Sequence, residues 1–238
     1  MARIHNFGAG PAGLPLPVLQ QAQSELLDYA GTGMSIMEMS HRSKTFEQVI
    51  QAAEANVRKI LGISNDYAVL FLQGGASGQF AQIPMNILGA GQTADYVHSG
   101  AWAEKAIKEA KTVGNVNVSW DGKSEKYMRM PRASELKLTP GAAYVHVTSN
   151  ETIGGVQFPS FPKTEAPLVG DMSSDIMCRK IDVNQFGLIY AGAQKNIGPS
   201  GLVLVIIRKD LAERVPEKVP AIYKYKTHMP EPSLYHTP

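Results

Sequence analysis

Two residues of complementary chemistry, Asp171 and Lys195, each follow a short apolar run of the sequence. Asp171 comes directly after residues 167–170, and Lys195 comes shortly after residues 188–191. Because the carboxyl ends of strands line the ligand crevice of an open α/β sheet, we expect a carboxylate and an amine to face one small molecule. Each residue also has a plainer interpretation: Asp171 can cap the turn that comes after it, and Lys195 can be solvated.

A glycine-rich segment, Gln73-Gly74-Gly75-Ala76-Ser77-Gly78, stands between the apolar run 67–72 and a helical pattern that continues to Ile87. The free N–H groups of a helix start, the helix dipole and the Ser77 hydroxyl together form a cradle for a phosphate. The segment lacks the Gly-Lys-Ser/Thr ending of a nucleoside triphosphate loop, so we predict a monophosphate ligand. A plain strand-to-helix turn is the structural alternative.

His41 and Arg42 are adjacent in a polar segment. Arginine binds carboxylates and phosphates through two hydrogen bonds, which suits an anion site, although a solvated surface pair fits equally well. The six histidines show no metal-ligand spacing, and Cys178 is the only cysteine, so we predict no metal site. The neighbours Ile176 and Met177 predict a buried Cys178 thiol.

Residues 8–13 satisfy the dinucleotide-binding pattern G-x-G-x-x-G. That pattern needs a preceding buried strand and a helix that begins within the glycines, whereas here the preceding apolar stretch is short and Pro11, Pro15 and Pro17 interrupt any helix. A turn that brings the backbone close to a ligand or another chain is the better interpretation. An NAD-binding module remains the third choice for the function.

The elements that must position these residues are seven apolar runs and several helical patterns. The runs expected as strands cover residues 67–72, 94–98, 115–119, 143–148, 167–170, 188–191 and 202–207, and the clearest helical patterns cover residues 17–29, 45–61 and 101–110. Strands and helices alternate, which predicts a mostly parallel, seven-stranded α/β sheet flanked by helices. We expect one domain over residues 1–238, with an extended N-terminal segment, 1–16.

The composition narrows the classes of partner. The 238 residues carry 23 basic and 21 acidic side chains, a net charge of +2, spread without a charged block. We therefore expect neither nucleic acid nor a membrane surface as a partner. The sequence has no apolar run of about 20 residues and no signal-peptide pattern at its start, so we expect a cytoplasmic protein.

The segment Ala-Gly-Ala-Gln-Lys-Asn-Ile-Gly-Pro at residues 191–199 resembles the Schiff-base segment of the phosphoserine aminotransferase family. This family belongs to the class V aminotransferases, which are fold-type I enzymes that depend on pyridoxal 5'-phosphate (PLP). Four more segments resemble family signatures in the same order, at residues 6–12, 39–44, 170–175 and 233–235. The resemblance covers the chain from Asn6 to Pro238 and implies the PLP-binding large domain, with the family's C-terminal small domain absent from this chain.

The resemblance also implies roles for single residues. Lys195 would attach the cofactor and Asp171 would pair with its pyridinium nitrogen, which keeps the ring protonated and electron-withdrawing. The implied cofactor contacts are stacking by Trp102, a hydrogen bond from Thr152 near the ring hydroxyl, and phosphate binding by Ala76, Ser77 and Gln194. No metal is implied.

Substrate and partner contacts are implied as well. His41 and Arg42 resemble the substrate-side anion site, and Arg42 is the better candidate for a carboxylate. His236 and Thr237 resemble a segment that reaches across a two-fold interface to the cofactor phosphate of the other subunit, which implies a homodimer with shared active sites. The family usually has Asn where this sequence has His236, so that phosphate contact differs here.

The implied reaction converts O-phospho-L-serine and 2-oxoglutarate to 3-phosphooxypyruvate and L-glutamate, a step of L-serine biosynthesis. Another fold-type I aminotransferase, such as the alanine-glyoxylate type, would share Lys195 and Asp171 but would need no second phosphate site. A PLP-binding fragment without catalytic activity is the other alternative. Half-reactions with phosphoserine and with alanine separate these possibilities.

Overall fold

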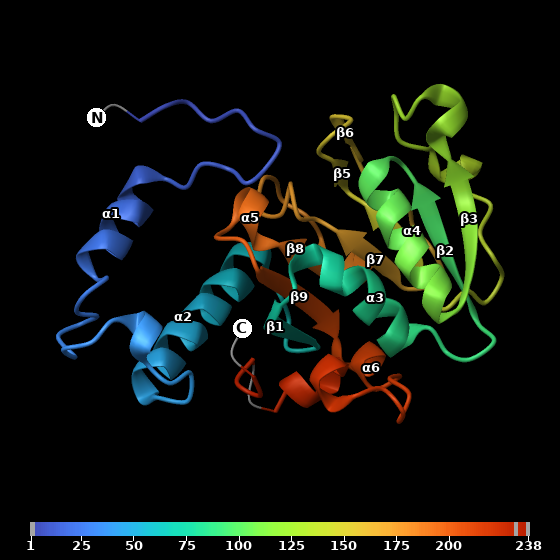
Figure 1. Ribbon diagram of the computed structural model, residues 1–238. Coiled ribbons are helices and arrows are strands. Elements are labelled where there is room, and N and C mark those ends of the chain that lie inside the picture. The colour runs from blue at the N-terminus through green and yellow to red at the C-terminus, as the bar shows by residue number, and fades with distance from the viewer. Residues whose placement is uncertain (1–2, 231–232, 237–238) are drawn as a thin grey trace.

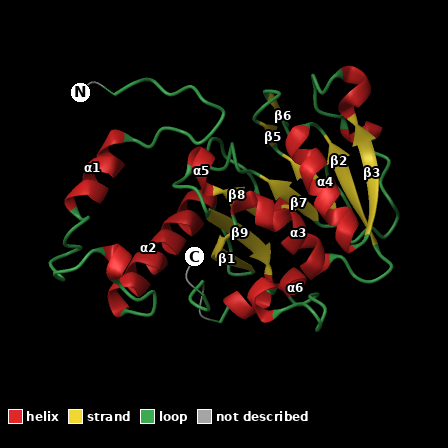
Figure 2. Ribbon diagram, viewed as in Figure 1, coloured by secondary structure: helices red, strands yellow, loops and turns green. Residues whose placement is uncertain are grey.

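A computed structural model describes residues 3–230 and 233–236 of the chain. Its centre is a seven-stranded sheet in the order β1-β9-β8-β7-β4-β2-β3 (Figures 1 and 2). The strands are β1 (Tyr67–Gln73), β2 (Thr93–His98), β3 (Asn115–Asp121), β4 (Val145–Thr148), β7 (Leu168–Asp171), β8 (Phe186–Gly192) and β9 (Leu202–Arg208). Strand β9 runs antiparallel to both of its neighbours, and the other four pairings are parallel. The predicted mostly parallel α/β sheet is confirmed, and each of the seven apolar runs forms a strand.

Helices flank this sheet, as the alternating pattern predicts (Figure 2). The α-helices are α1 (Leu16–Ser24), α2 (Lys44–Leu61), α3 (Gly75–Ile87), α4 (Ala101–Val113), α5 (Ala193–Asn196) and α6 (Lys209–Ala212). The short 3-10 helices are η1 (Ile36–Glu38), η2 (Gly122–Glu125), η3 (Ala133–Glu135), η4 (Val183–Gln185), η5 (Ala221–Tyr223) and η6 (Tyr225–His228). Among the described residues, none of the helices has the length and apolar character needed to cross a bilayer.

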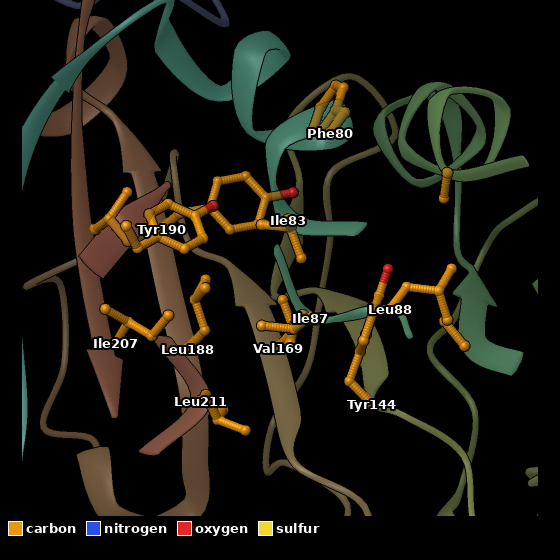
Figure 3. Close-up of a cluster of buried hydrophobic side chains, with 14 of the residues drawn as sticks. Phe80, Ile83, Ile87, Leu88, Tyr144, Val169, Leu188, Tyr190, Ile207 and Leu211 are labelled. Atoms are coloured by element: carbon orange, nitrogen blue, oxygen red, sulfur yellow. The ribbon is translucent and has the colours of Figure 1, made fainter. Parts of the chain in front are cut away.

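Each face of the sheet carries its own hydrophobic core, because its strands are apolar on both sides. Helices α3, α4 and α6 cover one face, where Phe80, Leu188 and Leu211 belong to one buried cluster (Figure 3). The other face packs against the C-terminal end of α2 and the segment after β7, where Val57 and Ile176 are buried. A sheet held between two cores is a rigid frame for side chains at its strand ends.

The N-terminal part of the chain differs from the rest because it buries little. Residues 3–14 have no helix or strand; they pass beside α5 and then lead to α1, which lies apart from the sheet (Figure 1). The side chains of Ile4, Phe7 and Leu27 are 88%, 92% and 85% exposed. Helix α1 ends at Ser24, earlier than the predicted Tyr29, and it has no buried residue to stabilise a longer helix.

Two further details differ from the expectations. A small hairpin of β5 (Asn150–Glu151) and β6 (Val156–Gln157) comes after β4 and has no clear signal in the sequence, because each strand has only two residues. The prediction that Cys178 is buried is wrong, since its side chain is exposed. Its neighbour Met177 has a φ of 63°, a left-handed conformation that turns the chain just before the cysteine.

Candidate functional site

A hollow of about 250 Å³ lies at the carboxyl ends of β4, β7 and β8, close to the lower limit of about 300 Å³ for small-molecule pockets. Both Asp171 and Lys195 line it. Its walls are formed by Gly74, Gly75, Ala76, Ser77, Trp102, Thr148, Asn150, Asp171, Ser173, Ser174, Gln194, Lys195, Ser200 and Gly201. The structure therefore brings the predicted acid and amine together, as expected for strand ends of an α/β sheet.

Asp171 is the last residue of β7, and its side chain is only 5% exposed. The amide and the hydroxyl of Ser173 both donate to its Oδ1 atom, over 2.9 and 2.6 Å. Burial raises the pKa of Asp171, while the Ser173 donors and the positive charge of Lys195 act against that rise. Asp171 thus caps the next turn and lines the hollow, so the two interpretations of this residue are compatible.

Lys195 lies in α5, the short helix after β8, and it is half-buried. Its Nζ atom lies 4.3 Å from the centroid of the Trp102 ring and donates to the Thr152 hydroxyl. Burial lowers the pKa of Lys195, against the opposing charges of Asp171 and Glu151. A lysine with a lowered pKa has more of the neutral amine, which is the form that attacks a carbonyl.

The glycine-rich turn forms the third wall of the hollow. Gly74 caps α3 in a left-handed conformation with a φ of 86°, and Ala76 and Ser77 lie in the first turn of that helix. The first N–H groups of a helix lack partners within the helix and favour an anion. A side chain at Gly192 would meet the Ala76 amide at 3.2 Å, so glycine allows the end of β8 to approach this turn closely.

Glu151 holds the aromatic wall in place. Its Oε2 accepts from the Trp102 amide at 3.0 Å and its Oε1 accepts from the Ala103 amide at 3.0 Å, so a buried carboxylate from β5 caps helix α4. The Ser99 hydroxyl also donates to Oε1, at 3.2 Å. The cap on the Trp102 and Ala103 amides fixes where Trp102 lies relative to the hollow.

The turn at residues 8–13, which is rich in glycine and proline, lies against the same site. The amide of Ala12 donates to the Gln194 carbonyl over 2.9 Å, and a Cβ atom at Gly10 would meet Lys195 Cγ at 3.0 Å. No strand precedes Gly8 within the described residues, and no helix begins among these glycines. The turn therefore approaches Lys195 closely within the same chain and lacks the context of a dinucleotide-binding fingerprint. Its approach to a ligand or another chain stays a prediction.

Other sequence-predicted site residues are not brought to this hollow within one chain. Arg42 is exposed and lines a separate hollow of about 420 Å³, with Pro230 and Leu234 on the same wall. His41 precedes Arg42 and does not line the site of Lys195. Their role in anion binding stays a prediction.

The C-terminal segment also lies elsewhere. The Ser233 hydroxyl accepts from the Phe71 amide over 2.7 Å, which holds the tail beside β1 at the edge of the sheet. His236 is exposed there and does not line the hollow of Lys195. Thr237 lies outside the described residues. The roles of both residues stay predictions.

Several residues of the hollow were not singled out from the sequence. Thr148 and Asn150 come at and just after the end of β4, the same signal that pointed to Asp171 at the end of β7. Ser200 and Gly201 precede β9, and they reach this edge of the sheet only because β9 runs antiparallel to its neighbours. That direction could not be read from the apolar run itself.

A larger hollow, of about 640 Å³, lies elsewhere, between residues 128–136 and 155–162. Its walls are mainly apolar and include two arginines but no carboxylate or lysine. Within residues 3–230 and 233–236, no group of three or more His, Cys, Asp or Glu residues could hold a metal ion. The smaller hollow, which combines an acid, an amine and an anion cradle, is thus the candidate active site.

Comparisons with known proteins agree with this geometry. Residues 4–227 match the family model described as aminotransferase class-V. The chain is 55% identical over 237 residues to the phosphoserine aminotransferase of Niallia circulans, and this match covers 99% of the chain and 66% of the relative. The chain thus spans slightly less than two thirds of the length of that relative.

Solved structures show the same likeness. The phosphoserine aminotransferase from Bacillus circulans subsp. alkalophilus superposes with a TM-score of 0.96 at 55% identity, over 99% of this chain and 66% of the other. The PLP-bound phosphoserine aminotransferase of Trichomonas vaginalis gives a TM-score of 0.93 at 37% identity, over 99% of this chain and 67% of the other. The chain therefore belongs to the class-V aminotransferase family.

Proposed function

We propose that this chain is the cofactor-binding part of a phosphoserine aminotransferase, which exchanges the amino group between O-phospho-L-serine and 2-oxoglutarate. One observation carries the proposal: Asp171, Lys195, Trp102 and the turn at residues 74–77 converge on a single hollow. Relatives with that activity share 55% of the residues over nearly the whole chain, which supports the same chemistry here.

The residues around the hollow fit PLP. The turn at residues 74–77 offers helix N–H groups and a hydroxyl to a phosphate, and Trp102 offers an aromatic face to a ring. Thr148 Oγ1 is buried in the wall and has no hydrogen-bond partner among the described residues, so a polar ligand would satisfy it. When bound, PLP withdraws electrons from the substrate carbon that loses its proton.

The chain's own side chains have distinct tasks in this proposal. The Asp171 carboxylate would hold a proton at the ring nitrogen of the cofactor, because a buried carboxylate favours a positive partner. The Lys195 amine would attach the cofactor and, once the substrate has taken its place, move a proton at the substrate's α-carbon. Thr152 accepts a hydrogen bond from that amine and so orients it.

We further propose a cytoplasmic homodimer with shared active sites. The exposed apolar side chains of Ile4, Phe7 and Leu27 favour burial against a second copy. Arg42 and the hollow of Lys195 lie in separate places on one chain, so Arg42 would bind the anionic substrate in the partner's site. We expect His41, His236 and Thr237 to act across the same interface.

Half-reactions test this function. The PLP-loaded chain is mixed with phosphoserine or with alanine, and the change in cofactor absorbance is followed over time. We expect phosphoserine to react and alanine to react far more slowly. Faster reaction with alanine would favour the alanine-glyoxylate type of enzyme. An unchanged spectrum with both amino acids would indicate a cofactor-binding fragment without activity.

A further inference from the structure

Two buried polar side chains, Tyr190 and His146, do not line the hollow, and Tyr190 occupies the strand position beside Asp171. Tyr190 in β8 is paired in register with Asp171 in β7, and paired residues of parallel strands project to the same face of the sheet. The Tyr190 hydroxyl lies 2.9 Å from Nε2 of His146 in β4. Tyr190 and His146 are 0% and 1% exposed, and Tyr190 belongs to the buried cluster of Figure 3. This polar pair therefore has no contact with solvent.

The register of β7 and β8 places the Tyr190 side chain beside that of Asp171, close enough for the Asp171 charge to act on the hydroxyl. Burial raises the pKa of Tyr190 well above its usual value, and the charge and the hydrogen bonding of Asp171 raise it further. A tyrosine that stays protonated is a permanent donor. Because a hydroxyl lone pair aimed at a carboxylate is repelled, the favourable arrangement has the Tyr190 proton directed at Asp171.

This arrangement fixes the state of His146. If Tyr190 donates its only proton to Asp171, the 2.9 Å contact requires that His146 Nε2 carry a hydrogen and donate to the tyrosine oxygen. Burial lowers the pKa of His146 to about 3, so the ring is neutral and its Nδ1 carries no hydrogen. Nδ1 is buried and has no partner among residues 3–230 and 233–236, which is consistent with an unprotonated nitrogen at that position.

We propose that Tyr190 and His146 are positioning residues, in which His146 Nε2 donates to Tyr190 and Tyr190 donates to Asp171, so that Asp171 stays ionised. The inference deepens the proposed function, since an ionised Asp171 is what a protonated ring nitrogen requires. Neither residue touches the hollow, so both act through Asp171.

Other groups also act on Asp171 and stay the same when the pair is changed. Ser173 donates twice to Oδ1, the positive charge of Lys195 favours the ionised carboxyl, and the negative charge of Glu151 opposes it. Loss of the Tyr190 donor alone should therefore raise the proton affinity of Asp171.

The test is the protonation of Asp171 in the chain without cofactor, followed by infrared spectroscopy of carboxylic acids against pH. The Asp171 signal is identified by its loss in Asp171→Asn. We expect Tyr190→Phe to move the Asp171 midpoint to higher pH by about 0.5–1 unit. His146→Leu should move the Asp171 midpoint in the same direction. In His146→Gln the midpoint should stay close to the wild-type value, because the amide of Gln keeps a donor near the Nε2 position.

Tyr144→Phe is the matched control. Tyr144 is as deeply buried in the same cluster (Figure 3), and its hydroxyl is bonded to that of Tyr96 over 2.7 Å. Its removal should leave the midpoint in place. An unshifted midpoint in both Tyr190→Phe and His146→Leu would overturn the inference, as would an equal shift in Tyr144→Phe. If Tyr190→Phe does not fold, the comparison of His146→Leu with His146→Gln gives the same answer.

A second readout is independent of Asp171. Nitrogen-15 shifts of labelled histidine report which ring nitrogen carries the hydrogen, with His146 assigned from His146→Gln. We expect the hydrogen on Nε2, and a hydrogen on Nδ1 would overturn the relay. Failure of the proposed function looks different: the wild-type chain would bind no PLP or would not react with phosphoserine, whatever the midpoints of Asp171 are.

Discussion

The Nζ atom of Lys195 lies 4.3 Å from the centroid of the Trp102 ring, and the Nζ atom of Lys105 lies 4.4 Å from the same ring. The indole therefore contacts both the amine of the candidate site and a lysine of its own helix. A ring in this place can stack on a flat ligand that occupies the hollow beside Lys195. We therefore expect the position of Trp102 to be central to cofactor binding.

We expect Trp102→Leu to weaken PLP binding by about 2–12-fold, the equivalent of about 0.5–1.5 kcal/mol for an aromatic pair. Trp102→Phe should retain most of the affinity, because it keeps an aromatic ring. Equilibrium titration with PLP, followed by absorbance, measures both. Equal affinities for the Leu and Phe variants would contradict the stacking role.

Glu151→Gln should destabilise the fold by about 1.5–3 kcal/mol, the range for a lost charged hydrogen-bond partner at a buried site. The reason is that the carboxylate accepts from the amides of Trp102 and Ala103 and faces the N-terminal end of α4. Glu104→Gln is the control, since it changes an exposed acid in the first turn of the same helix. Urea unfolding compares them, and equal losses of stability in the two variants would show that Glu151 is not a specific cap.

His146 makes the stability depend on pH. Its pKa is lowered to about 3 by burial, whereas an unfolded histidine titrates near 6.5, so below about pH 6.5 the unfolded chain binds a proton that the folded chain does not. The free energy of unfolding then falls as the pH falls, by up to about 1.4 kcal/mol per unit, and this contribution is constant above pH 6.5.

We therefore expect His146→Gln to lose less stability than the wild type between pH 6.5 and 5, in urea unfolding at a series of pH values. His228, whose pKa burial also lowers, is present in both proteins and cancels in the comparison. Parallel curves for the two proteins over this range would mean that His146 binds its proton over the same pH range in the folded and the unfolded chain, which contradicts a lowered pKa.

Mixing of two inactive variants tests the shared sites. If Arg42 serves the partner's site, a dimer of Lys195→Ala and Arg42→Ala chains has one site with both defects and one intact site. We expect activity to recover to as much as half of the wild-type value per mixed dimer. If Arg42 serves its own chain, each site keeps one defect and mixed dimers stay inactive. Tagged chains confirm that mixed dimers have formed.

The sheet could be predicted well from the sequence because β1, β8 and β9 are rich in consecutive apolar residues and β3 alternates apolar and polar residues, both of which are strand signals. The hairpin of β5 and β6 was missed because two residues are too few to show a period. The direction of β9 was also beyond the sequence, since parallel and antiparallel strands that are buried on both faces read alike.

Only the part of the site that has local signals in the sequence could be predicted. Asp171 and Lys195 come after strand ends, which is a local signal, whereas Glu151 acts on a helix that begins 50 residues earlier in the chain. The contact of Tyr190 with His146 likewise joins two strands that lie 44 residues apart. Such contacts depend on which strands become neighbours, and periodicity does not specify that.

The attachment of PLP to Lys195 is the step on which the proposed function depends most. The chain is incubated with PLP, reduced with borohydride, and analysed by intact mass and by peptide mapping. We expect a mass gain of one cofactor per chain, located on Lys195, and no gain in Lys195→Ala. A gain that persists in Lys195→Ala, or that is spread over surface lysines such as Lys108, would contradict the assignment of this site.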